Sequence, residues 1–242
     1  MDRNEFVRWK REGSIGILSL SNNKENYLEV PDFIEMQELR QWTEEPNLKG
    51  IIIHGIGRNF SAGANLERLK ELVNNRKVLS DKLSKGKEVL NYIEQLEIPV
   101  IASINGVCFG GGLEIALACH IRIASKNALF AFPEINHGLI PGLGGTFRSV
   151  KLLKNKAFEV ILNGDMMNAD KALEIGLIDD VSENKDAFEY AREKLLRMTE
   201  GRSLELIRFA MKALKNADLL AKEEALQEET RMFCELAANL KI

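Results

Sequence analysis

The sequence predicts an α/β protein whose parallel sheet is followed by a helical C-terminal lobe. As far as about residue 180 of the 242, short β-branched segments alternate with amphipathic ones. That alternation is typical of a parallel sheet covered by helices. From residue 186 onward the periodicity is almost entirely helical. We therefore divide the chain into a core, residues 1–185, and a helical lobe, residues 186–242, that we expect to serve oligomerisation.

The strands are predicted from short apolar runs that glycine, proline or polar residues bound on both sides. Ile51, Ile52 and Ile53 form the centre of one run, and Pro99 opens another that ends at Ile104. Runs this apolar indicate strands that are buried on both faces. The predicted strands span residues 14–20, 48–54, 99–104, 121–124 and 129–132, with a short strand or turn at 176–178.

The helices are predicted from apolar residues that recur every three or four positions. Asp32, directly after Pro31, is predicted as the N-cap of the first helix. A break is expected in the C-terminal lobe near residues 201–203. The predicted helices span residues 32–42, 64–72, 156–163 and 168–175, with a long one between 73 and 97 and others that begin at Leu113 and Thr146.

Composition excludes several classes of function. The net charge is −3 and the basic residues are scattered, so there is no electrostatic basis for binding nucleic acid. No apolar run has the length of a membrane span, and the charged first twenty residues predict no signal peptide. The three cysteines and three histidines lack the spacing of metal ligands or a redox motif. We expect a cytoplasmic protein without a metal site.

The most informative stretch is residues 105–119, NGVCFGGGLEIALAC, in which a strand leads through Gly110-Gly111-Gly112 into a helix. The free N–H groups at a helix start suit a phosphate, a carboxylate or a developing oxyanion. Glu114 lies one turn further on and would repel a phosphate. It would suit acid–base chemistry beside a thioester or ketone oxygen. The alternative is a partly exposed glutamate that caps the helix start.

Two further segments could belong to the same site. Residues 60–66, FSAGANL, again place a glycine-bearing loop between a strand and a helix, so two N–H groups could hold one oxygen from two sides. The alternative is an ordinary turn. Glu134 follows Pro133 in an apolar stretch and could couple to Glu114 as an acid–base pair, or lie on a surface loop.

The glycine-rich residues 142–146 do not predict a nucleotide site. They lack the GxxxxGK[ST] pattern of a phosphate-binding loop. The region of Gly106 also fails the dinucleotide fingerprint, because Cys108 stands where glycine is required. We interpret the loop at Gly142 as part of a pocket wall.

Together, FSAGANL, NGVCFGGGLEIALAC and FPEINHGLIPGLGGT resemble the enoyl-CoA hydratase/isomerase (crotonase) superfamily over nearly the whole chain. The resemblance implies a crotonase-like spiral of ββα units, a homotrimer or hexamer, and thioesters of coenzyme A as substrates. It implies an oxyanion hole formed by the N–H groups of Ala62 and Gly111. The two catalytic carboxylates would be Glu114 and Glu134. Coenzyme A would enter as part of the substrate, and no other cofactor is implied.

The resemblance also implies which residues surround the substrate, and it shows departures. Asn65 stands where aspartate is usual, and so does His120. The usual final helix, which contacts the nucleotide of coenzyme A, is missing, so a carrier-protein thioester is an alternative substrate. The predicted contact residues are Lys24, Asn26, Tyr27, Ala62, Gly63, Ala64, Asn65, Leu66 and Gly142.

The function that this resemblance implies is hydration of a 2-trans-enoyl thioester, a lyase reaction that passes through an enolate. One alternative is a double-bond isomerase on the same scaffold, for which the second carboxylate alone would suffice. Another is a non-catalytic protein that only binds acyl thioesters.

Overall fold

The computed structural model describes residues 6–183 and 186–238. Residues 1–5, 184–185 and 239–242 lie outside the described residues. The first two of these ranges belong to the predicted core and the last to the predicted helical lobe.

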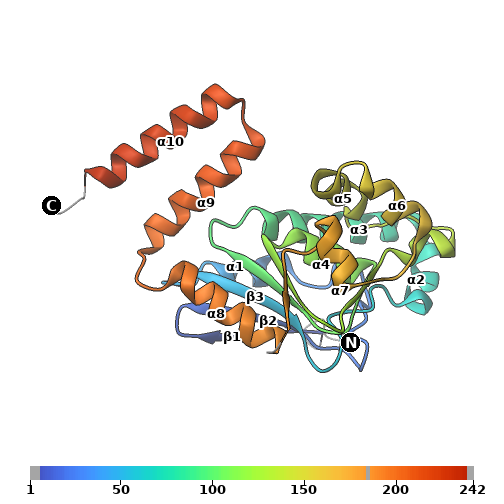
Figure 1. Ribbon diagram of the computed structural model, residues 1–242. Helices are drawn as coiled ribbons and strands as arrows, with labels where there is room; N and C mark the ends of the chain where they lie inside the picture. Colours follow the sequence, from blue (N-terminus) through green and yellow to red (C-terminus); the bar gives the residue numbers. More distant parts are fainter. Residues whose placement is uncertain (1–5, 184–185, 239–242) are drawn as a thin grey trace.

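A six-stranded sheet in the order β1-β2-β3-β4-β6-β9 forms the centre of the fold (Figure 1). β1 pairs with β2 in antiparallel fashion, and every other pair in this sheet is parallel. Two of these strands were not predicted: β1 precedes the first predicted strand, and β9 follows residues 176–178, which form a turn. The strands span Val7–Glu12 (β1), Ile15–Leu20 (β2), Gly50–Gly55 (β3), Val100–Ile104 (β4), Ile121–Ser125 (β6) and Asp180–Ser182 (β9).

Both faces of this sheet are covered, which explains why its strands read as continuous apolar runs. Ile52, Ile101 and Ile123 are fully buried in the cluster that includes Leu195 of α8 (Ala187–Thr199). Alternate residues of the same strands, such as Ile53, join a larger core with α3 (Arg76–Glu94) and α4 (Gly111–Ala118). The predicted parallel α/β core is confirmed.

A second, three-stranded sheet places the glycine run. β5 (Val107–Phe109) pairs in parallel with β7 (Leu129–Ala131), which pairs in antiparallel fashion with β8 (Met167–Asn168). β5 ends immediately before Gly110, so this sheet fixes the point at which α4 begins. The sequence prediction lacked β5 and β8.

The remaining helices follow the predicted pattern, with one displacement. α1 begins at Met36, four residues after Asp32, so the predicted N-cap is wrong. The Asp32 carboxylate is instead buried and accepts a hydrogen bond from Lys82 of α3 at 3.1 Å. These helices span Met36–Thr43 (α1), Leu66–Val73 (α2), Gly145–Leu153 (α5), Lys156–Asn163 (α6) and Ala169–Ile175 (α7).

The C-terminal region consists of α8, α9 (Leu204–Leu219) and α10 (Lys222–Ala237). α8 packs against β3, β4 and β6, whereas α9 and α10 form an arm that extends away from the sheet (Figure 1). The predicted break lies between α8 and α9, where Ser203 caps α9 by accepting from the N–H of Leu206. No described helix combines the length and the apolar composition that a membrane-spanning helix requires.

Candidate active site

The site forms where β5 leads into α4. Gly110 has φ of +49°, and a methyl group in its place would lie 2.6 Å from Oε1 of Glu134. The backbone conformation favours glycine there, and any side chain would force the Glu134 carboxylate to shift. Every residue of α4 is buried, so its glycine start faces the interior of the protein.

Glu114 is held by the glycine-rich loop before α5. Its side chain is buried, and Oε1 accepts hydrogen bonds from the N–H groups of Leu143 and Gly145, each at 2.6 Å. Burial raises the pKa of Glu114, while these N–H groups and the charge of Arg148 oppose the rise. The alternative of an exposed capping glutamate is wrong, because Glu114 makes no cap and points into the protein.

Arg148 holds the loop that positions Glu114. Its buried guanidinium donates to the backbone oxygen of Leu143 at 2.9 Å, to Glu94 at 3.0 Å and to Asn91 at 2.8 Å. It thus fixes the loop whose N–H groups hold Glu114. No local sequence pattern identifies Arg148, because its partners on α3 lie more than fifty residues away.

Glu134 lies in a short 3₁₀ helix, Pro133–His137, and faces the same cavity as Glu114. Its Oε2 is buried and has no hydrogen-bond partner among the described residues. Burial, with a further contribution from the charge of Glu114, raises the pKa of Glu134 to about 7. The structure therefore brings together the two carboxylates that sequence spacing alone could not connect.

Of the two predicted oxyanion donors, Gly111 remains a candidate and Ala62 does not. The N–H of Ala62 donates to the backbone oxygen of Glu25 at 2.9 Å and is not available to a ligand. The prediction of Ala62 as an oxyanion donor is therefore wrong. Ala64 and Gly111 both line the cavity, and a methyl group on Gly111 would lie 3.9 Å from the nitrogen of Ala64. Within residues 6–183 and 186–238, no backbone oxygen accepts from either of these two N–H groups.

The other predicted contact residues divide into two groups. Ala64, Asn65 and Gly142 line the cavity. Asn26 instead holds neighbouring loops, since its buried amide donates to the backbone oxygens of Ile56 at 2.9 Å and Asn59 at 2.8 Å. The predicted residues that do not line the cavity are Lys24, Asn26, Tyr27, Ala62, Gly63 and Leu66.

His120, the second departure, lies outside the cavity. Its Nδ1 accepts from the N–H of Val100 at 3.0 Å at the start of β4. Burial lowers its pKa to about 4, so the ring is neutral at pH 7 and serves as a backbone acceptor.

The cavity has a volume of about 150 Å³ and is mainly apolar. Its polar side chains are Glu29, Asn65, Glu114 and Glu134, and no lysine, arginine or histidine of the described residues lines it. In the described part of the chain, no cluster of acidic, histidine and cysteine side chains could hold a metal ion. The apolar lining comes from Leu28, Pro31, Leu69, Leu72, Val73, Leu79, Leu83, Leu139, Ile140 and Leu143.

Comparison with known proteins identifies similar sequences and structures. The sequence profile of the enoyl-CoA hydratase/isomerase family matches residues 10–242. A probable enoyl-CoA hydratase of Bacillus subtilis is 33% identical over 226 residues, which cover 91% of this chain and 86% of that protein. The 2,3-dehydroadipyl-CoA hydratase of Escherichia coli is 32% identical over 84% of this chain and 78% of its own length. The crystal structure of an enoyl-CoA hydratase from Bacillus anthracis matches with a TM-score of 0.84 and 31% identity over 94% of this chain and 89% of that one.

Proposed function

The chain belongs to the enoyl-CoA hydratase/isomerase family, and on that premise we propose that it adds water across the double bond of 2-trans-enoyl thioesters. The observation that carries this proposal is the convergence of Glu114 and Glu134 on one apolar cavity. Two carboxyl groups with different environments can act as a base and an acid in one reaction.

In the proposed reaction the thioester oxygen lies between the N–H groups of Ala64 and Gly111. Negative charge develops on this oxygen when water attacks the β-carbon. Gly111 is the first residue of α4, so the positive end of the helix dipole also faces that charge. Two N–H groups without a described protein acceptor can stabilise the enolate without first breaking other hydrogen bonds.

The environments of the two carboxyl groups suggest their roles. Glu114 accepts two short hydrogen bonds, which favour its charged form, and we assign it as the base that takes a proton from water. Glu134 has a pKa of about 7 and retains a proton near neutral pH, so we assign it as the acid that protonates the α-carbon. The hydroxyl adds to the β-carbon, and proton exchange with solvent restores both groups. No cofactor besides the coenzyme A of the substrate is proposed.

The lining of the cavity suggests the acyl group. Leu72, Val73 and Leu79 lie among its apolar walls. No lysine, arginine or histidine of the described residues lines the cavity, so a charged end of the acyl chain would have no cationic side chain to pair with there. Burial of an unpaired carboxylate is strongly unfavourable. We therefore propose apolar enoyl chains, and we expect the dicarboxylic chain named for the Escherichia coli relative to be a poor substrate here.

We further propose that the protein is a cytoplasmic homotrimer or hexamer. α9 and α10 carry exposed apolar side chains that a partner subunit would bury, among them Leu214, Leu219 and Phe233. Sedimentation equilibrium at micromolar concentration should give the mass of three or six chains, and a monomer would contradict this proposal.

The activity is tested with paired substrates. Crotonyl-CoA should lose its enoyl absorbance and gain the mass of one water, and a crotonyl carrier-protein thioester tests the other carrier. Conversion of a 3-enoyl-CoA to the 2-enoyl isomer, without hydration of either, would identify an isomerase. Binding of acyl-CoA over a range of chain lengths without turnover would identify a non-catalytic protein.

A further inference from the structure

We propose that Glu29 is a positioning residue that fixes the Ala64 N–H through the side chain of Asn65. This inference rests on the proposed function, because Ala64 matters only as a donor to the thioester oxygen. Glu29 lines the cavity together with Asn65 and Ala64, and its side chain is only 17% exposed.

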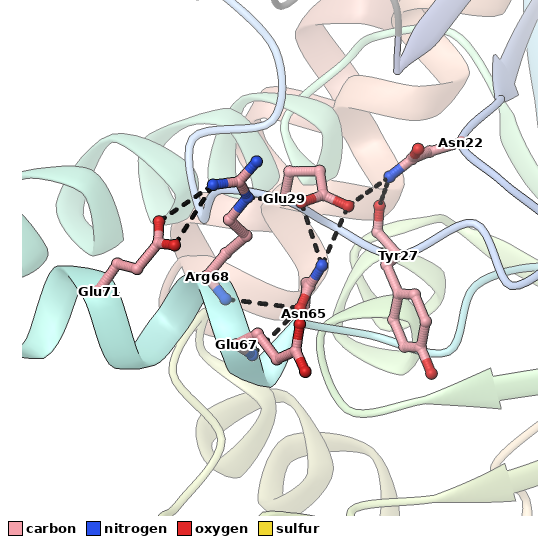
Figure 2. Close-up of polar contacts among 7 residues, drawn as sticks. All are labelled: Asn22, Tyr27, Glu29, Asn65, Glu67, Arg68 and Glu71. Atoms are coloured by element: carbon pink, nitrogen blue, oxygen red, sulfur yellow. Dashed lines mark hydrogen bonds and ion pairs between the residues drawn. The ribbon is translucent and has the colours of Figure 1, made fainter. Parts of the chain in front are cut away.

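The Glu29 carboxylate joins the loop that follows β2 to the start of α2 (Figure 2). It accepts from Nδ2 of Asn22 at 2.9 Å and from Nδ2 of Asn65 at 3.2 and 3.1 Å, and it pairs with Nε of Arg68 at 3.4 Å. Asn22 also donates to the backbone oxygen of Tyr27 at 2.8 Å, which fixes the segment that leads to Glu29. The carboxylate is therefore anchored on both sides of the Asn65 amide.

Asn65 uses both ends of its amide in this arrangement. Its Oδ1 accepts from the N–H groups of Glu67 at 3.1 Å and Arg68 at 3.4 Å, which caps the start of α2. Because those two partners are donors, the oxygen must face α2 and the NH₂ group must face Glu29. An aspartate could cap the helix in the same way, but it could not donate to Glu29.

Ala64 is held directly beside this pair. The N–H of Leu28 donates to the oxygen of Gly63 at 2.8 Å, and the N–H of Asn65 donates to the oxygen of Leu28 at 3.0 Å. Ala64 lies between these two bonds and is itself the residue bridged to Leu28, the neighbour of Glu29. A displacement of Asn65 or Glu29 therefore moves the Ala64 N–H relative to Gly111.

The two side chains are matched in charge as well as in geometry. The substitution N65D would place a second carboxylate about 3 Å from the first, and like charges at that distance repel strongly. The additional substitution E29Q would remove the repulsion and supply an amide that donates to the new carboxylate. The pair should thus tolerate an exchange of its amide and its carboxylate, but not two carboxylates.

The test compares wild type, E29Q, N65D and the double variant E29Q/N65D, with E71Q as the matched control. Glu71 pairs with Arg68 on the outer side of α2 at 3.1 Å and does not line the cavity. Steady-state hydration of crotonyl-CoA gives kcat and KM separately. Amide hydrogen exchange over residues 60–69 reports the backbone of this segment without any need for activity.

We expect N65D to lower kcat by about 10- to 100-fold, which is less than the loss that follows complete removal of an oxyanion donor. The KM of N65D should stay within about threefold of the wild-type value. E71Q should stay within about threefold of wild type. E29Q should give a kcat between those of wild type and N65D, because a neutral amide accepts from the Asn65 NH₂ group less strongly than a carboxylate. E29Q/N65D should recover most of the kcat lost in N65D. Exchange over residues 60–69 should be faster in N65D and return toward the wild-type rate in the double variant.

The inference is overturned if an active wild type gives N65D an unchanged kcat, or if E29Q/N65D loses as much as N65D. If the wild type hydrates no thioester, the proposed function fails. Faster exchange in N65D with recovery in E29Q/N65D would then still support the link from Glu29 through Asn65, whereas unchanged exchange would overturn it.

Discussion

Replacement of Glu134 by glutamine should remove a pH-dependent loss of folding stability. Burial raises the pKa of this carboxyl from 4.5 to about 7, so the folded protein holds the proton at pH values where the unfolded chain has released it. The stabilisation from this proton is fully present below pH 4.5 and is lost as the pH rises to about 7. The difference between the pKa values of the folded and unfolded states corresponds to about 3 kcal/mol in the free energy of unfolding, at about 1.4 kcal/mol per pKa unit.

Urea unfolding of wild type and E134Q between pH 4 and 8.5 measures this effect. The free energy of unfolding of the wild type should fall by about 3 kcal/mol relative to the variant across the window from pH 4.5 to 7. Outside that window the two curves should run parallel, because other titrating groups are shared. Curves that are parallel throughout would show that Glu134 titrates like an exposed carboxyl group, and its assignment as the acid would fail.

Three further predictions concern the reaction. E114Q and E134Q should each lower kcat for hydration by about 10²- to 10⁴-fold. Because the two residues act as one unit, the loss of kcat in the double variant should be much smaller than the product of the two single losses. Full activity of both variants on every thioester would contradict the mechanism. G110A should lower kcat by at least about tenfold, because its methyl group would displace the Glu134 carboxyl group from its position in the cavity. G176A is its control, since Gly176 also has a positive φ but open space around it, and an equal loss in both would refute this explanation. An enoyl-CoA with a terminal carboxylate should show a kcat/KM at least about tenfold below that of an apolar chain of equal length, and equal values would contradict the proposed specificity.

Much of the fold could be predicted because a buried parallel strand leaves a direct trace in the sequence. Ile51, Ile52 and Ile53 are apolar at successive positions since both faces of β3 are covered. The first helix was misplaced because Asp32 after Pro31 resembles an N-cap locally, whereas its partner Lys82 lies fifty residues away. β5 and β8, with three and two residues, are too short to give a periodic signal.

The candidate site was predictable where the residue type itself carries the chemistry. Glu114 and Glu134 stand out as acids in apolar segments, and the structure places both at one cavity. The choice between Ala62 and Ala64 depends on which N–H is already used, and that is decided by the oxygen of Glu25, far outside the motif. Glu29 and Arg148 act through partners distant in sequence, so no local pattern identifies them.

The measurement that tests the central claim most directly is incorporation of oxygen from solvent. Crotonyl-CoA is incubated with the wild type, E114Q and E134Q in ¹⁸O-labelled water, and the product is analysed by mass spectrometry. We predict one ¹⁸O atom in a 3-hydroxyacyl product of the wild type, with formation slowed by about 10²- to 10⁴-fold in either variant. A product without solvent oxygen, or equal labelling rates in all three proteins, would contradict the account.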